Sequence, residues 1–345
     1  MTQATEFSEQ CNISLKGQGL APRGQSLCLI MRTISIGRND AGQRLDKFLS
    51  KAVKGLPLSM MYKCIRTKKI KVNRKRTEQS YMLCEGDEIQ LFIRDEFFES
   101  PERDNSALSR ITPKINIVYE DENVMLVNKR QGVLVHEDTD GGENTLIMHI
   151  KAYLYAKGEY DPDKEQSFAP ALCNRIDRNT GGIVIAAKNA ESLRDMNERI
   201  KNGDISKHYL CLVHGAPPRK NEVLHAYLKK DSKSNTVEVR DKHFEGSKEI
   251  ITGYTVLEHR GSESLLEIEL FTGRTHQIRA HMAHIGCPLV GDGKYGINKE
   301  DKSRGYKYQA LYAYKLLFPK TSKADSLSYL DGREFKIDKR DIWFV

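Results

Sequence analysis

The chain has 345 residues, of which 39% are hydrophobic and 30% are charged. This balance is typical of a globular protein with about two domains. The longest uncharged apolar runs, such as residues 181–187, fall far short of the roughly 20 residues that cross a bilayer, so we expect no membrane span. Fifty-five basic against 47 acidic residues give a net charge of +8, which permits a polyanionic partner without proving one.

Cysteine usage and the first residues bear on the compartment. Seven cysteines stand at positions 11, 28, 64, 84, 173, 211 and 287, an odd number with no C-x-x-C pair. This spacing argues against a disulfide framework or a cysteine zinc site, and reduced thiols fit a cytoplasmic protein. Residues 1–30 lack the apolar core of a signal peptide, so we expect a disordered leader there.

Residues 31–95 have the pattern of a small mixed domain. Apolar residues from Leu45 to Val53 recur at helical spacing, and Ser59 is expected to cap a second helix that ends near Arg66. Residues 70–73 alternate like a strand, and residues 88–93 form a later one.

A dense positive surface is expected from the same domain. Residues 63–76 contain eight basic side chains and no acidic one: Lys63, Arg66, Lys68, Lys69, Lys71, Arg74, Lys75 and Arg76. Such a surface releases counterions when it meets a phosphate backbone, although most charge runs are solvated faces. The lack of any compensating acid favours RNA or DNA.

This domain resembles the S-four-like RNA-binding module. The resemblance rests on the sequence RLDKFL at 44–49, the second helix, and IKVN at 70–73 before an acidic turn. It implies that two helices and a basic loop are presented to structured RNA.

The rest of the chain is expected to form one larger domain. Residues 96–112 are acidic and interrupted by Pro101, and we interpret them as a linker before a domain at 113–345. Strands are expected at 115–119, 124–128, 183–187, 208–213 and 265–271, with a helix capped by Asn189 and ended by Gly203. Strands dominate without a βαβ rhythm, which predicts an α+β domain around a mixed, largely antiparallel sheet flanked by helices.

One segment places an aspartate between two arginines. Arg175, Asp177 and Arg178 precede a glycine pair and a buried strand. Nearby arginines favour the ionised carboxylate, and such a group suits nucleophilic work on a sugar carbon or a base. A structural Arg–Asp network that closes a turn explains the same residues, and residue types alone favour that interpretation.

A second segment, residues 273–286, predicts a short helix that contributes to a site. Ile278, Met282 and Ile285 share one face, and Arg279 lies at its margin, where it can be partly buried and point inward. His276 and His281 are separated by about 140° of helix, so they cannot share one ion, and we expect no metal site.

A third segment holds Tyr209. It alternates with Cys211 and Val213 on the core-facing side of a strand. A tyrosine in a site can stack on a base, but a strand tyrosine is more often part of the core, and composition does not choose between the two.

Together these segments resemble the RluA-type large-subunit ribosomal RNA pseudouridine synthases. The resemblance spans residues 113–320 and rests on RID-R-x-T-x-G at 175–182, GRTHQIR-x-HM at 273–282, and PL-x-GD-x-x-YG at 288–296. It implies an RNA-modifying isomerase with the pseudouridine synthase fold.

The resemblance implies roles for individual residues. Asp177 matches the catalytic aspartate, Arg279 the arginine paired with it, and Tyr209 the tyrosine that stacks on the target base. Arg175 matches the arginine that takes the place of the flipped uridine, and we expect Arg178, Arg274 and His276 to contact RNA. Two positions depart from the family pattern, because Asn174 stands where histidine is usual and Gly181 where serine is common.

The implied reaction moves the ribose bond from nitrogen 1 to carbon 5 of the base, so it needs no redox cofactor, ATP or metal. The uridine must first leave the helical stack. Large-subunit rRNA is the expected target, and a monomer is the expected state. Two rivals stay open: a non-catalytic RNA-binding protein, and another S-four-linked enzyme such as a methyltransferase, although no glycine-rich cofactor loop is present in the sequence.

Overall fold

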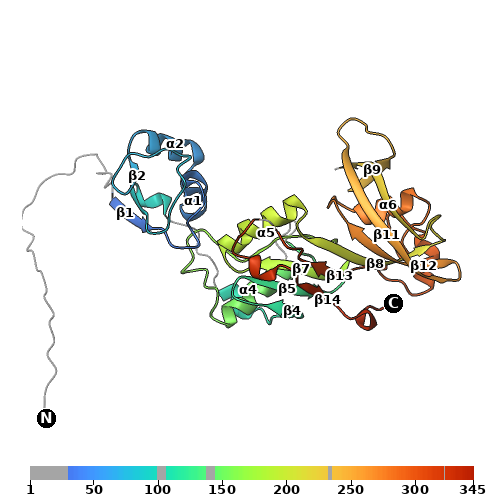
Figure 1. Cartoon of the computed structure of the whole chain (residues 1–345). Helices are drawn as coiled ribbons and strands as arrows, with labels where there is room; N and C mark the ends of the chain where they lie inside the picture. Colours follow the sequence, from blue (N-terminus) through green and yellow to red (C-terminus); the bar gives the residue numbers. More distant parts are fainter. Residues whose placement is uncertain (1–29, 99–105, 137–143, 232–234, 322) are drawn as a thin grey trace, which may run out of the picture.

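The structure is a computed structural model that describes residues 30–98, 106–136, 144–231, 235–321 and 323–345. The leader expected at residues 1–30 lies outside these ranges except for its last residue. Figure 1 shows a small N-terminal unit, in blue, beside a long twisted sheet with helices that the rest of the chain forms. The α+β class predicted from the sequence is confirmed.

The N-terminal unit has a small sheet and two helices. In its described part, three antiparallel strands lie in the order β1–β3–β2, with bounds β1 (Ile30–Ser35), β2 (Ile70–Val72) and β3 (Glu88–Ile93). Helices α1 (Leu45–Ala52) and α2 (Leu58–Arg66) bury their apolar faces in a core that includes Phe48 and Ile89.

The expectation that Ser59 caps α2 is wrong. Pro57 occupies the N-cap position, with φ −59° and ψ 143°, and the helix begins one residue later at Leu58. The proline ring fixes φ near the helical value, so it starts the helix without a side-chain cap. Ser59 therefore lies inside the first turn.

The segment between the two parts is partly structured. A 3-10 turn, η1 (Asp95–Phe97), and a short helix, α3 (Ser106–Arg110), lie within or beside the expected linker. Leu108 is buried as α3 packs against α4 (Leu146–Ala156). The second half of the expected linker, which forms α3, therefore packs on the larger domain.

Hydrogen bonds join the N-terminal unit to the larger domain. The Asn39 amide donates to Glu165 Oε1 at 3.0 Å, and Arg194 Nη1 donates to the Ala41 carbonyl at 3.0 Å. The Ser167 hydroxyl donates to Asp40. These polar contacts fix the N-terminal unit against the start of α5 (Ala190–Asn202) and the loop before β6 (Ala171–Leu172).

The large sheet is mixed and largely antiparallel. Across the described residues it has eleven strands, nine of them in the order β10–β9–β11–β12–β8–β13–β7–β5–β4, while β14 pairs with β13 and β6 with β7. The bounds of the other strands are β4 (Ile117–Glu120), β5 (Val124–Lys129), β7 (Gly181–Ala187), β8 (Ser206–His214), β9 (Asn221–Asp231), β10 (Thr236–Arg240), β11 (Lys248–Arg260), β12 (Glu263–Leu270), β13 (Leu311–Leu317) and β14 (Glu334–Lys336). Strands β7 and β13 run parallel.

Helices cover the two faces of the sheet. On β7, Ile183 and Ile185 pack with Met196 of α5, whereas Val184 and Ala186 pack with α4. Side chains alternate along a strand, so α4 and α5 lie on opposite faces. The face that carries α4 also carries α6 (Gln277–His284), which packs on β8.

The remaining helical segments are short: α7 (Asn298–Ser303), η2 (Ser328–Leu330) and η3 (Lys339–Asp341). Among the helices of the described residues, none combines the length and the apolarity that a membrane crossing requires.

Candidate active site

The centre of the site is an arginine held by two aspartates. Arg279, on α6, donates from Nη1 to Asp177 Oδ2 at 2.8 Å. The other two nitrogens of the same guanidinium donate to Asp292, from Nε to Oδ2 at 2.7 Å and from Nη2 to Oδ1 at 2.8 Å. Asp177 lies in the loop between β6 and β7, so residues far apart in sequence meet here.

The two aspartates differ in exposure. The Asp292 side chain is 0% exposed and that of Asp177 is 26% exposed. Asp177 Oδ2 takes the bond from Arg279, and no donor from the described part of the chain reaches Oδ1. Asp177 therefore offers a carboxylate oxygen to whatever enters the site.

Electrostatics favour the charged forms of Arg279 and Asp292. Burial alone would lower the pKa of Arg279, but the hydrogen bonds and charge of Asp292, with the charge of Asp177, raise it above the ordinary value. Burial opposes ionisation of Asp292 too, yet its pKa stays below the ordinary value because Arg279 and two backbone N–H groups bond to it.

Tyr209 lies beside this group on β8, as the alternation predicts. It belongs to the apolar cluster with Ile278 and Met282 of α6, and it is 6% exposed. Burial, followed by the nearby charge of Asp177, raises the pKa of its phenol. The ring is thus a neutral apolar surface within the field of the aspartate.

Sequence reasoning missed Lys129 at the end of β5. Its side chain is 1% exposed, and the ammonium donates to three carbonyls, those of Arg130, Val133 and Arg178. Burial lowers its pKa to about 8, an effect that the charge of Asp177 opposes. The lysine ties the loop of Asp177 to the end of β5, and a strand pattern that ended one residue earlier gave no hint of it.

The histidines of α6 have separate partners. His276 precedes the helix with φ 53°, in the left-handed region, and its Nδ1 pairs with the Tyr295 hydroxyl at 2.9 Å. Nδ1 of His281 pairs with the Thr252 hydroxyl at 3.0 Å. Burial lowers the pKa of both imidazoles, to about 4 for His281.

Basic side chains next to Asp177 in the sequence, and on the segments that carry Arg279 and Asp292, lie at the surface. Arg175, Arg178 and Arg274 are exposed, and so is Lys294. Nε of Arg178 donates to the Gly132 carbonyl at 3.1 Å, which anchors its base while leaving the side chain at the surface. Exposed basic side chains of this kind attract a polyanion.

Two family models match the chain. The model described as RNA pseudouridylate synthase matches residues 123–284, and the model described as S4 domain matches residues 43–89. An RNA pseudouridine synthase of Mycoplasma genitalium, itself uncharacterized, is 33% identical over 318 residues, which are 90% of this chain and 96% of that protein.

The chain belongs to the RNA pseudouridine synthase family.

Further relatives agree with this assignment. The ribosomal large subunit pseudouridine synthase C of Buchnera aphidicola is 34% identical, with 78% of this chain and 82% of that protein covered. The protein of the same name in Escherichia coli is 31% identical, with coverages of 79% and 82%. These relatives are of the RluA type, so that resemblance is confirmed, and the chain is an isomerase that acts on RNA.

A solved structure shows the same fold. The human RNA pseudouridylate synthase domain containing 1 is 21% identical, with a TM-score of 0.50, and the match covers 66% of this chain and 92% of that one. At this identity the likeness concerns the fold alone. The pseudouridine synthase fold predicted from the sequence is confirmed.

The two departures from the family pattern have local reasons in this synthase. Asn174 accepts a hydrogen bond from the Ile185 backbone at 2.8 Å, so it fastens the loop of Asp177 to β7. A Cβ at Gly181 would lie 2.5 Å from a ring carbon of Tyr312. Because Tyr312 fills this space, a serine does not fit there without movement of the ring.

The basic residues of the S4 domain lie on its surface. Lys63 and Arg66 are exposed on α2, Lys68, Lys69 and Arg74 are exposed around β2, and Lys71 is half-buried with its ammonium 5.4 Å from the Phe92 ring centre. Lys68 and Arg74 have positive φ, of 63° and 64°, so tight turns carry them. The basic residues of the run at 63–76 are therefore at the surface on and around α2 and β2, with Lys71 half-buried.

Proposed function

We propose that this synthase converts specific uridines of large-subunit ribosomal RNA to pseudouridine, with Asp177 as the catalytic residue. The observation that carries the proposal is the Asp177–Arg279 ion pair, with the buried Tyr209 ring within the field of Asp177 and the exposed Arg175 and Arg178 beside Asp177 in the sequence. The target follows the names of the relatives, which are large-subunit ribosomal pseudouridine synthases.

The reaction is an isomerisation within one nucleotide. The bond from ribose C1′ to N1 of uracil breaks, a bond from C1′ to C5 forms, C5 loses its proton and N1 gains one. Asp177 initiates it by one of three routes: attack on the ribose, attack on the base, or removal of a ribose proton. Arg279 holds the carboxylate in a fixed direction throughout by its hydrogen bond to Oδ2.

The target base has to leave the RNA helix to reach Asp177, which lies below the surface. Tyr209 then provides a flat neutral ring against which the detached base rotates without leaving the site. The exposed Arg175 guanidinium fills the position that the uridine vacates in the stack. Arg178, Arg274 and His276 hold the flanking phosphates.

We further propose a division of labour between the two domains. The S4 domain at 31–95 provides affinity through its basic surface, and the domain at 113–345 provides chemistry. Phosphate contacts of this kind are sensitive to salt and independent of base sequence. A monomer in the cytoplasm, where ribosomes are assembled, accounts for all of these features.

The test is release of tritium from rRNA labelled at uridine C5, because each turnover discharges the C5 proton. Full-length large-subunit rRNA, ribosomal precursor particles and a tRNA pool serve as substrates. We expect release from one of the large-subunit substrates with the wild type and none with Asp177→Asn.

Release from tRNA alone would contradict the target. Release by Asp177→Asn at the wild-type rate would contradict the catalytic residue. Tight RNA binding without release from any substrate would favour the rival interpretation, a non-catalytic RNA-binding protein.

A further inference from the structure

The hold on Arg279 is divided unequally between its two aspartates. Asp292 accepts hydrogen bonds from two of the three guanidinium nitrogens, Nε and Nη2. The third nitrogen, Nη1, donates to Asp177. A bidentate pair is stronger and more directional than a single bond. The orientation of the guanidinium is therefore set from the Asp292 side, away from the opening.

Asp292 is itself fixed by the turn that carries it. Its Oδ1 accepts the backbone N–H groups of Lys294 at 2.8 Å and Tyr295 at 3.2 Å. A Cβ at Gly291 would lie 2.3 Å from the Tyr308 carbonyl oxygen, so the backbone at this turn is closely packed. The Gly291 N–H also donates to the buried Asp301 at 2.7 Å.

We propose that Asp292 is a positioning residue for the isomerisation, an inference that rests on the proposed role of Asp177. Asp292 fixes the guanidinium through Nε and Nη2, so Nη1 meets Asp177 Oδ2 from a fixed direction, and Asp177 Oδ1 stays open for ribose or base. Without Asp292, the fork of Arg279 is free to turn and pair with both Asp177 oxygens.

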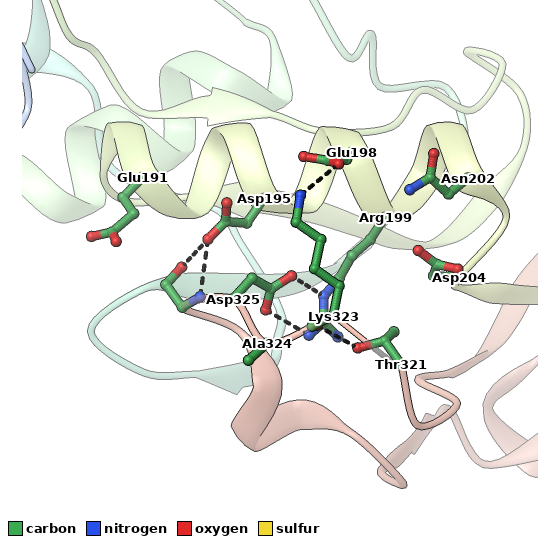
Figure 2. Close-up of a pocket in the computed structure, with 11 residues that line it drawn as sticks. Glu191, Asp195, Glu198, Arg199, Asn202, Asp204, Thr321, Lys323, Ala324 and Asp325 are labelled. Carbon is green, nitrogen blue, oxygen red and sulfur yellow. Dashed lines mark hydrogen bonds and ion pairs between the residues drawn. The ribbon is translucent and has the colours of Figure 1, made fainter. Parts of the chain in front are cut away.

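The same chain provides a matched control. Arg199 on α5 pairs with Asp325 through Nε at 2.7 Å and Nη2 at 2.6 Å, and with Asp331 through Nη1 at 2.7 Å. Figure 2 shows Arg199 and Asp325 of this second arrangement. Met196 of the same helix packs on the face of the sheet opposite to Tyr209 and α6. Asp325 is thus the counterpart of Asp292 without access to the reacting atoms.

The experiment compares Asp292→Asn with Asp325→Asn in the full-length chain. Tritium release gives kcat and KM on the large-subunit rRNA substrate, and thermal unfolding gives Tm. We expect both variants to lower Tm, while Asp292→Asn alone lowers kcat, by about 100-fold as expected for a misplaced reacting group, with KM unchanged. Equal kcat for the two variants and the wild type would overturn the proposal, as would a loss that tracks Tm in both.

Wild type and Asp177→Asn are measured in the same series. An inactive wild type, or an active Asp177→Asn, overturns the proposed function, and this inference falls with it. An inactive Asp177→Asn beside a fully active Asp292→Asn overturns this inference alone.

If Asp292→Asn does not fold, NMR of protein with labelled arginine provides a second test. The quantity measured is the exchange rate of the Arg279 Nε–H proton with water. The proposal predicts that this proton stays protected from exchange in Asp177→Asn, because Asp292 holds that edge independently. Rapid exchange of Nε–H in Asp177→Asn would overturn it.

Discussion

Arg279 and Arg199 are held in the same geometry, and the comparison shows what separates a catalytic ion pair from a structural one. In each case Nε and Nη2 of the guanidinium donate to one aspartate, and Nη1 donates to a second. The nitrogen–oxygen distances are 2.6–2.8 Å. Both side chains are buried, at 7% and 2% exposure. Ion-pair geometry alone does not distinguish the two sites.

The difference lies in the second aspartate of each group. Asp331 uses Oδ1 for Arg199, and its Oδ2 accepts the Thr321 backbone N–H at 3.1 Å. In Asp177 the corresponding second oxygen receives no hydrogen bond within the described residues. A structural carboxylate has both oxygens engaged, whereas the proposed catalytic one keeps an oxygen for the substrate.

The surroundings differ in charge as well. The cavity beside Arg199 is lined by further acids, among them Asp195, Glu198 and Asp204, as Figure 2 shows. Asp177 instead has the exposed Arg175 and Arg178 beside it in the sequence. A phosphate backbone is repelled from the first site and attracted to the second.

A large contrast is expected from replacing each arginine with lysine. An ammonium cannot bond two carboxylates through a rigid fork. Arg279→Lys is expected to lower kcat about 100-fold through misplacement of Asp177. Arg199→Lys should leave kcat at the wild-type level, and both should lower the unfolding free energy by about 1–3 kcal/mol as buried acceptors lose partners.

Tritium release and urea unfolding measure the two effects. A loss of kcat in Arg199→Lys as large as in Arg279→Lys would erase the distinction between the sites.

A second expectation concerns acid. Burial opposes ionisation of Asp325, yet the hydrogen bond from Arg199 holds its pKa below the ordinary 3.8. Its contribution to stability is therefore full above the unfolded value and is lost as pH falls through the folded one. Asp325→Asn should lower the unfolding free energy by about 3 kcal/mol at neutral pH, with the difference shrinking in acid.

Urea unfolding of both proteins between pH 7 and pH 3 measures this difference. A gap that stays constant over that range would mean that the charge of Asp325 is not what stabilises the group around Arg199.

The smallest effect is expected at the start of the helix that carries Arg199. The Asn189 side chain accepts the Ser192 backbone N–H at 2.9 Å. Asn189→Ala should therefore lower the unfolding free energy by about 1 kcal/mol. Unchanged kcat would confirm that α5 is structural, while a fall in kcat at full folding would connect it to the active site.

Local patterns predicted the local structure well. Asn189 and Gly203 bound α5 as expected, because a capping side chain and a left-handed glycine, here with φ 80°, act within one turn. The strand at 88–93 was likewise predicted at its observed bounds. Helix α4 was not predicted, because its apolar residues are not confined to one face, and neither were β9, β10, β11 and β13.

Long-range geometry explains most of what sequence reasoning missed at the site. The motif residues Asp177 and Arg279 were identified, and the structure brings them together. The hold of Asp292 on Arg279 and the three carbonyl contacts of Lys129 depend on turns packed against each other, which no periodicity records. The parallel pairing of β7 with β13, which joins residues near 181 to residues near 312, is of the same kind.

The most direct test compares Asp177 with Asp331, the aspartates that bind Nη1 of Arg279 and of Arg199. Both kcat and the unfolding free energy are measured for each variant. For Asp177→Asn we predict a loss of kcat of about 1000-fold or more. Its unfolding free energy should change by about 0–1 kcal/mol, because the lost pair is partly exposed.

For Asp331→Asn we predict the reverse, a loss of about 2 kcal/mol in unfolding free energy, since a charged hydrogen bond is removed, with kcat unchanged. If Asp177→Asn kept wild-type kcat, or if both variants lost activity only in step with stability, the open carboxylate oxygen would not be the catalytic feature of this synthase.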